Sequence, residues 1–187
     1  MTASLTRRPA PFTYREYCLL PEDGKRHELI EGDFFVTPAP SPRHQTVSRR
    51  LQYLLMQALE EPGHAQVFDA PVDLLLHDES VVQPDLVVVS TARTSLITAR
   101  GIEGVPDLVV EILSPSTGDR DLQLKRRVYE RFGIPEYWVV DPVSCFVTVW
   151  TLENGRYEQR AYLDRASTLT WPAYPALSVD LSRVFRP

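Results

Sequence analysis

Residues 105–113, VPDLVVEIL, place the strongest constraint on how this chain folds. Successive side chains of a β-strand point to opposite faces, and in this run both faces are mostly apolar. A strand of this kind needs cover on both sides, which is typical of a central strand in a sheet with helices on its faces. The run therefore predicts a buried central strand.

Capping, turn and periodicity signals predict the other elements. Pro71 marks an edge or a bend, and Ser41-Pro42 predicts a helix start with Ser41 as N-cap. The elements expected before residue 105 are a helix over 13–20, a hairpin of 26–30 and 33–37, an amphipathic helix from 42 to about 60, one or two strands over 64–78, one strand over 81–90, and a loop or short helix over 91–104.

The elements expected after residue 113 begin with a helix from about 119 to 132, which has a capping signal at 116–119 and ends at Gly133. Three strands follow within 136–163, with Asn154-Gly155 as a hairpin turn. The tail reads as mostly irregular, with a last helical turn near 180–185. This order predicts an α/β or α+β domain with a mixed sheet flanked by helices.

Length and composition fit one domain over residues 1–187, with a core from about 12 to 165. The chain has 187 residues, 43% of them hydrophobic, and a formal net charge of −5. This charge argues against a general nucleic-acid coat protein but not against a nuclease, in which a metal ion offsets acidic ligands. No signal peptide or long apolar run is present, so we expect a soluble, cytoplasmic protein.

The two cysteines, Cys18 and Cys145, are far apart and have no metal-ligand spacing. We expect both to be buried as small hydrophobic side chains rather than joined in a disulfide or bound to zinc.

The predicted central strand carries a carboxylate, Glu111, on the same face as Asp107. Burying a glutamate is costly unless it is paired or bound to a metal ion. Asp85 and Asp107 each follow a proline at the start of a strand, so either could be a second carboxylate of one site. The alternative for each is an ordinary salt bridge or a strand cap.

A lysine lies on the apolar face of the predicted helix that follows. Leu122, Lys125, Tyr129 and Phe132 share this face, and Lys125 is one of only two lysines in a chain with eighteen arginines. A lysine can extend its ammonium group out to solvent along its apolar stem. The short connection from the Glu111 strand instead indicates that Lys125 reaches an acidic site.

Two carboxylates and a lysine suit magnesium-dependent phosphoryl chemistry. Mg²⁺ prefers oxygen ligands and retains several waters, so one or two carboxylates can hold it. The ion polarises a phosphoryl oxygen and lowers the pKa of a bound water. A nearby ammonium group can stabilise charge that develops on the phosphate.

Several segments together resemble the Uma2 family (DUF820), which is placed in the PD-(D/E)XK nuclease superfamily with the restriction-endonuclease-like fold. They span about residues 27 to 157 and are specific in their order and spacing. The matching segments are HELIEGDF, TPAPSPRHQ, VVQPDLVVVS, PDLVVEILSPST, DLQLKRRVYERFGIPEYWVVDP and NGRYE.

The resemblance implies a role for particular residues. Pro84-Asp85 would be the PD element and Glu111 the acidic member, with both carboxylates holding Mg²⁺ or Mn²⁺. The superfamily pattern has a lysine two positions after Glu111, where this chain has Leu113. The resemblance implies that this lysine has migrated to Lys125.

Two further residues lie in family-like segments and are candidates to complete the pocket. Glu28 and His44 could act as metal-shell or general-base groups, although His44 could equally make ordinary hydrogen bonds at a helix start. The substrate implied is nucleic acid, DNA rather than RNA. Nucleases that cut both strands often act as dimers, and the strands of 136–163 offer an edge for a homodimer.

Two alternatives to a nuclease remain open at this stage. One is a catalytically weak or inactive module that binds nucleic acid or regulates, suggested by the acidic net charge. The other is that Asp85, Glu111 and Lys125 form a structural ion-pair cluster, in which Lys125→Met should be tolerated.

Overall fold

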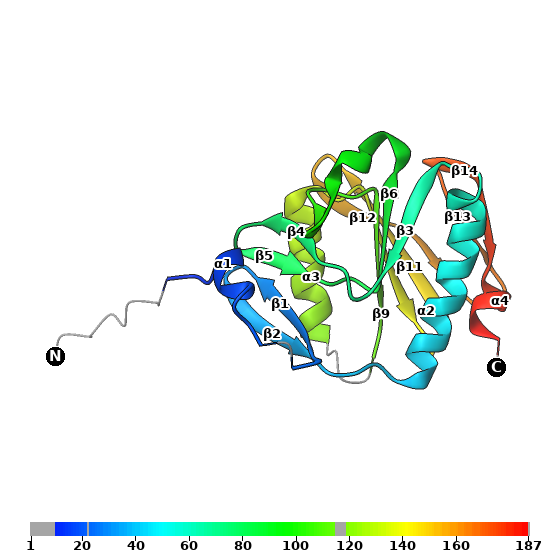
Figure 1. Ribbon diagram of the computed structural model, residues 1–187. Helices are drawn as coiled ribbons and strands as arrows, with labels where there is room; N and C mark the ends of the chain where they lie inside the picture. Colours follow the sequence, from blue (N-terminus) through cyan, green and yellow to red (C-terminus); the bar gives the residue numbers. More distant parts are fainter. Residues whose placement is uncertain (1–9, 22, 115–118, 187) are drawn as a thin grey trace.

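The computed structural model describes residues 10–21, 23–114 and 119–186 (Figure 1). Its centre is a six-stranded mixed sheet, here called the central sheet, with the order β12-β11-β10-β9-β6-β3. Its strands are β3 (Ala65–Asp69), β6 (Leu86–Ser90), β9 (Leu108–Ile112), β10 (Glu136–Asp141), β11 (Phe146–Glu153) and β12 (Arg156–Leu163).

A second sheet also has six strands, in the order β2-β1-β5-β4-β8-β7. These are β1 (Arg26–Ile30), β2 (Asp33–Thr37), β4 (Leu74–His77), β5 (Ser80–Val82), β7 (Ile97–Thr98) and β8 (Gly101–Glu103). The remaining elements are α1 (Tyr14–Tyr17), α2 (Pro42–Leu55) with a π-helical turn (Met56–Glu60), a 3-10 helix (Thr91–Leu96), α3 (Asp119–Phe132), β13 (Thr168–Trp171), β14 (Tyr174–Asp180) and α4 (Leu181–Phe185).

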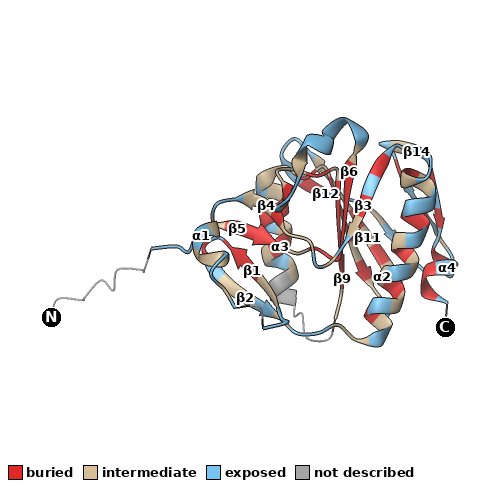
Figure 2. Ribbon diagram, in the orientation of Figure 1, coloured by how far each residue is buried: buried red, intermediate tan, exposed pale blue. Residues whose placement is uncertain are grey.

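The predicted central strand is β9, which pairs in parallel with β10 and antiparallel with β6. All five of its residues are buried (Figure 2). Leu108, Val110 and Ile112 belong to the core on the α2 side, while Val109 belongs to the core that contains α3 residues. The alternation expected from the sequence is therefore confirmed, and it turns Glu111 toward α3.

Two hydrophobic cores cover the two faces of the central sheet. On one face, α2 buries Val47, Leu51 and Leu55, and the β13–β14 hairpin and α4 complete the cover (Figure 1). On the other face, α3 lies between the central sheet and the second sheet. There, Tyr129 packs in one cluster with Ile30 and Val82 of the second sheet and with central-sheet residues.

Several predicted boundaries agree with the structure. The hairpin of β1 and β2 has the predicted strands, with positive φ at Glu31 and Gly32 (52° and 81°). Helix α3 runs from 119 to 132 as expected, and Asn154-Gly155 forms the turn between β11 and β12. Helix α1 starts with the predicted capping box but is shorter than expected. The capping signal at 116–119 extends outside the described residues.

The single strand predicted over 81–90 is wrong, because the chain forms β5 and β6 in two different sheets. The break falls at Gln83 and Pro84. Proline has no N–H for a ladder, and the backbone groups of Gln83 bond to side chains instead, its N–H to Glu28 and its C=O to Arg26. The chain thus passes from the second sheet to the central sheet immediately before Asp85.

The tail and residues 91–104 are more regular than predicted. β13 and β14 pair antiparallel, and Leu169, Trp171, Leu177 and Val179 point alternately into the α2-side core. This period-two pattern is present in the sequence, but the prolines around it suggested irregular structure. Residues 91–104 contain the 3-10 helix and the short strands β7 and β8.

The expectation that both cysteines are buried is wrong. Cys18 is exposed at the end of α1, and Cys145 is half-buried in the turn between β10 and β11, where its φ is 61°. Both are free thiols in turns, and Cys145 packs against the edge of the α2-side core without being fully covered. Separately, no described helix has the length and apolar character that crossing a membrane requires.

Truncating Leu51 should destabilise the fold, because this fully buried side chain joins α2 to the central sheet. We expect Leu51→Ala to lower the free energy of unfolding by about 2–5 kcal/mol in urea titrations. Tyr53→Ala on the same helix is the matched control, because Tyr53 is 55% exposed, and it should change stability by less than about 0.5 kcal/mol. Equal losses in both variants would contradict the proposed packing.

Candidate functional site

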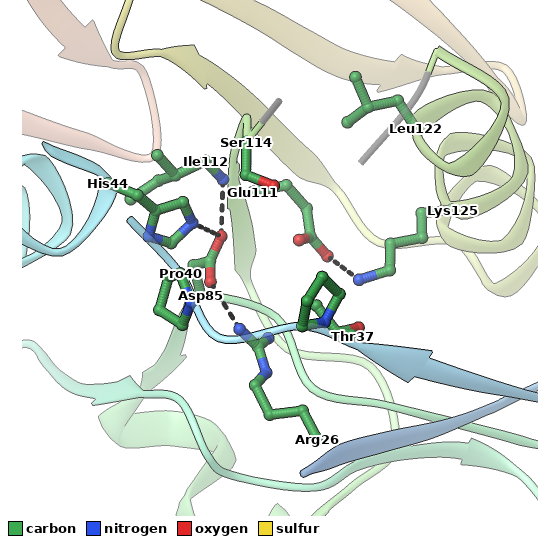
Figure 3. Close-up of a pocket in the computed structure, with 11 residues that line it drawn as sticks. Arg26, Thr37, Pro40, His44, Asp85, Glu111, Ile112, Ser114, Leu122 and Lys125 are labelled. Carbon is green, nitrogen blue, oxygen red and sulfur yellow. Dashed lines mark hydrogen bonds and ion pairs between the residues drawn. The ribbon is translucent and has the colours of Figure 1, made fainter. Parts of the chain in front are cut away.

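A small polar pocket lies where β9 ends, α2 begins and β6 starts (Figure 3). Asp85, Glu111, Lys125, His44 and Arg26 all line it. Its internal volume is about 20 Å³, which is enough for one water molecule or ion. Of the residues that the sequence predicted for the site, Asp85, Glu111, Lys125 and His44 therefore share one pocket. The remaining one, Glu28, does not line the pocket but contacts Lys125.

Asp85 is held at the start of β6 by three donors. Its Oδ1 lies 3.1 Å from Arg26 Nη1, and its Oδ2 accepts a 2.8 Å hydrogen bond from the Ile112 N–H and lies 3.1 Å from His44 Nε2. Burial alone raises the pKa of Asp85, but the His44, Arg26 and Ile112 contacts outweigh it and hold that pKa below its ordinary value. Asp85 is therefore an ionised carboxylate at neutral pH.

Lys125 joins two buried carboxylates. Its Nζ lies 2.9 Å from Glu28 Oε1 and 3.1 Å from Glu111 Oε1, and the residue is only 4% exposed. The alternative that Lys125 extends to solvent is therefore wrong. The helix periodicity that placed it on the apolar face of α3 was the decisive signal.

Hydrogen bonds from neighbouring residues fix both carboxylates. Glu111 Oε1 also accepts a 2.6 Å hydrogen bond from the Tyr129 hydroxyl. Glu28 accepts from the Gln83 N–H at 2.8 Å and from Thr37 Oγ1 at 3.4 Å. Tyr129 is a core residue whose hydroxyl positions Glu111.

Burial and two neighbouring carboxylates disfavour the ionised form of Glu111. Burial raises the pKa of Glu111 to about 7, with Lys125 opposing this effect and the charges of Asp85 and Glu28 adding to it. A cation bound beside Asp85 and Glu111 would relieve both the repulsion and the lost solvation.

His44 comes from the first turn of α2, which Ser41 caps by accepting a 3.2 Å hydrogen bond from the His44 N–H. Its Nε2 contacts Asp85, whereas its Nδ1 is buried and has no hydrogen-bond partner among the described residues. When Nε2 carries the ring proton, Nδ1 is an unprotonated acceptor.

Asp107, the other candidate for the second carboxylate, lies elsewhere. It accepts a 2.7 Å hydrogen bond from the Ser90 N–H and lies 3.7 Å from Arg93. Asp107 precedes β9, whereas Glu111 lies near its end, so the two carboxylates cannot reach the same pocket. The pair formed by Asp85 and Glu111 is the one that the fold brings together.

Sequence reasoning missed Arg26 and Gln83. Arg26 is two residues before Glu28 on β1, so strand alternation places both side chains on one face and could have identified it. Gln83 carries no such signal, because it acts through backbone groups that become available only where the chain leaves one sheet for the other.

The oxygen donors that face the pocket suit a divalent ion. Within the described parts of the chain, no group of three or more His, Cys, Asp or Glu residues is placed to hold a metal ion. Two carboxylates, Asp85 and Glu111, face the pocket, and Figure 3 shows the Glu111 carboxylate between Asp85 and Lys125. Two hard oxygen donors and retained waters suit Mg²⁺, so the residues fit the ion in number and kind.

The mixed sheet, its flanking helices and the clustered acidic residues and lysine define a restriction-endonuclease-like domain. The model of the Uma2 family, described as "Putative restriction endonuclease", matches residues 13–182, and the chain belongs to this family. The fold resembles the crystal structure of a "putative nuclease belonging to DUF820" from Anabaena variabilis ATCC 29413, with a TM-score of 0.78 and 21% identity. That alignment covers 94% of this chain and 98% of the other. No curated protein matches the chain.

Replacing Lys125 tests whether the buried charges need it. Lys125→Met leaves Glu28 and Glu111 without their shared cation, so we expect the free energy of unfolding to fall by about 3–5 kcal/mol at pH 7.5. Arg127→Met, at an exposed position of the same helix, should be close to neutral in the same denaturant titration. Full tolerance of Lys125→Met is the result that the structural-cluster alternative requires.

Glu111 should make stability depend on pH in a chelating buffer. Its folded pKa of about 7 exceeds the roughly 4.3 of an unfolded chain, so the native state binds more protons between these values. Its contribution to stability is therefore fully present below about pH 4.3 and is lost as the pH rises through 7.

Glu111→Gln removes this titration while keeping the side-chain shape. We expect the stability of the variant relative to the wild type to rise between pH 4.5 and 7.5, by at most about 1.4 kcal/mol per pH unit. Urea titrations over this range measure the difference. A relative stability that falls with rising pH contradicts the expected shift.

Proposed function

We propose that this protein is a Mg²⁺-dependent nuclease that hydrolyses phosphodiester bonds of DNA. Asp85 and Glu111 would hold the ion, and Lys125 would serve as the migrated catalytic lysine. The observation that carries the proposal is the position of Lys125, whose ammonium group lies 3.1 Å from Glu111 in the pocket that Asp85 also lines. Membership of the Uma2 family supports a nuclease-like role and a nucleic-acid substrate.

The residues around the pocket suit hydrolysis by water. When bound, Mg²⁺ would polarise a phosphoryl oxygen and lower the pKa of a coordinated water. Lys125 would stabilise the negative charge that develops on the phosphate. As the oxygen of the attacking water bonds to phosphorus, the water would release its proton to solvent, and the leaving ester oxygen would take up a proton from solvent. His44 would assist by holding Asp85 through its Nε2.

Other residues position these groups without contacting the substrate. Glu28 and Tyr129 restrain Lys125 and Glu111, and Arg26 restrains Asp85. These contacts lock side-chain rotamers, which keeps the reacting groups in place before the substrate binds.

A second candidate is a catalytically weak or inactive nucleic-acid-binding or regulatory module with the same fold. It is favoured by the contacts of Asp85, whose two oxygens already accept hydrogen bonds or ion pairs from Arg26, His44 and Ile112. Calorimetric titration with Mg²⁺ or Mn²⁺ separates the candidates. Binding that Glu111→Ala abolishes favours the enzyme, and absence of binding favours the module.

Cleavage assays on single-stranded DNA, duplex DNA and RNA test the proposed activity. We expect Mg²⁺-dependent cleavage of DNA that EDTA abolishes and that Asp85→Asn and Lys125→Ala each slow by at least about 100-fold. Arg127→Ala, an exposed substitution on α3, should cleave at the wild-type rate.

Thermal melting of each variant shows whether lost activity reflects lost folding, and Asp85→Asn serves as the test if Lys125→Ala does not fold. The proposal is wrong if the wild-type protein leaves all three substrates intact, or if folded Asp85→Asn cleaves as fast as the wild type.

A further inference from the structure

A larger groove opens beside the pocket and shares four lining residues with it. Its volume is about 510 Å³, within the roughly 300–1,000 Å³ of ligand pockets. Arg26, Pro40, His44 and Asp85 line the groove as well as the small pocket, where Figure 3 labels them. The pocket itself has room for one ion or one water only, so a substrate must be held outside it, and the groove is directly adjacent.

One wall of the groove is a polar face of α2. Gln45, Ser48, Arg49 and Gln52 all line it, at positions i, i+3, i+4 and i+7 of the helix. Gln45 and Arg49 are exposed, and none of these four side chains has a hydrogen bond or ion pair within the described parts of the chain. The opposite face of α2 carries the apolar residues that pack on the central sheet, so this polar face is not needed for folding.

The other wall is the segment that leaves β3, with Asp69, Ala70 and Pro71. The Ala70 N–H donates a 3.2 Å hydrogen bond to the Asp85 C=O, which ties this wall to the backbone of the site. The groove is therefore fixed relative to Asp85 on both sides, by this bond and by the contact between His44 and Asp85.

Positive charge gathers on α2 although the chain is acidic overall. Arg43, Arg49 and Arg50 lie on this helix, and Arg186 lies near it. Desolvation and the positive charges of the other three arginines lower the pKa of Arg50. Arg43 and Arg50 donate to backbone carbonyls at the end of α4, whereas Arg49 lines the groove.

A second observation also points to a ligand. His44 is only 6% exposed, lines the groove, and has no hydrogen-bond partner for Nδ1 among the described residues. A buried polar atom of this kind is costly unless a ligand or water satisfies it.

We propose that this groove binds one nucleic-acid strand along the polar face of α2 and delivers its phosphodiester to the pocket, with Arg49 on a backbone phosphate and Gln45 and Gln52 hydrogen-bonded to the nucleotide. The inference rests on the proposed nuclease function for its substrate class. An arginine supplies charge and paired donors for a phosphate, and glutamine amides can both donate to and accept from sugar or base atoms. Gln45 and Gln52 would favour a strand with sugar and base atoms over a polyanion that lacks them, such as polyglutamate.

Binding is measured by the fluorescence anisotropy of labelled DNA and RNA 12-mers, single-stranded and duplex, with the full-length protein in EDTA so that nothing is cleaved. We expect Arg49→Ala to weaken binding about five- to tenfold and to reduce the salt slope of log K by about 0.7–0.9, as loss of one phosphate contact predicts. Gln52→Ala should weaken binding without changing that slope. Arg156→Ala, at an exposed arginine outside the groove, should change neither.

Three outcomes overturn the groove proposal: no binding by the wild type, equal losses for Arg49→Ala and Arg156→Ala, or displacement of the labelled strand by polyglutamate as readily as by unlabelled DNA. The two proposals fail separately. Mg²⁺-dependent cleavage by the wild type together with undiminished binding by Arg49→Ala would support the nuclease proposal and contradict the groove proposal. Weakened binding by Arg49→Ala without any cleavage by the wild type would support the groove proposal and contradict the nuclease proposal.

Discussion

The ammonium group of Lys125 is shared by two buried carboxylates, and the architecture around the pocket depends on that pairing. Glu28 comes from the second sheet, Glu111 from the central sheet, and Lys125 from the helix packed between them. Buried carboxylates without a cation would be strongly destabilising. The interaction therefore fixes how the two sheets and α3 sit at this end of the molecule, and it concentrates charge beside Asp85.

The passage of the chain from one sheet to the other builds the second half of the pocket. At Gln83 the backbone leaves the β5 ladder, and its N–H and C=O bond to Glu28 and Arg26. Two residues later Asp85 immediately precedes β6 and contacts Arg26 and His44. A single crossing thus places the acidic residue beside these two side chains and beside the wall of the groove. The site is consequently a property of the junction between sheets.

Elements with strong local signals were predictable from the sequence. The two-sided apolar run gave β9, the amphipathic periods gave α2 and α3, and Asn154-Gly155 gave a hairpin turn. Signals failed where long-range pairing decided the outcome. The run over 81–90 looks like one strand because its composition is uniform, yet its two halves pair with different partners. The tail hairpin forms because α2 leaves apolar surface that Trp171 of β13 and Leu177 of β14 cover.

The sequence by itself determined the residue types of the site and the faces that carry them. Strand alternation turned Glu111 toward α3, and helix periodicity placed Lys125 on the face that packs against it. Only the tertiary structure decided which carboxylate is the partner. Asp85 and Asp107 have the same local pattern before a strand, but β6 and β9 are antiparallel, so the two residues lie at opposite edges of the central sheet. The tertiary structure also decided the roles of Arg26, Gln83 and the groove along α2. Contacts between segments distant in the chain depend on how the two sheets cross, which no local pattern encodes.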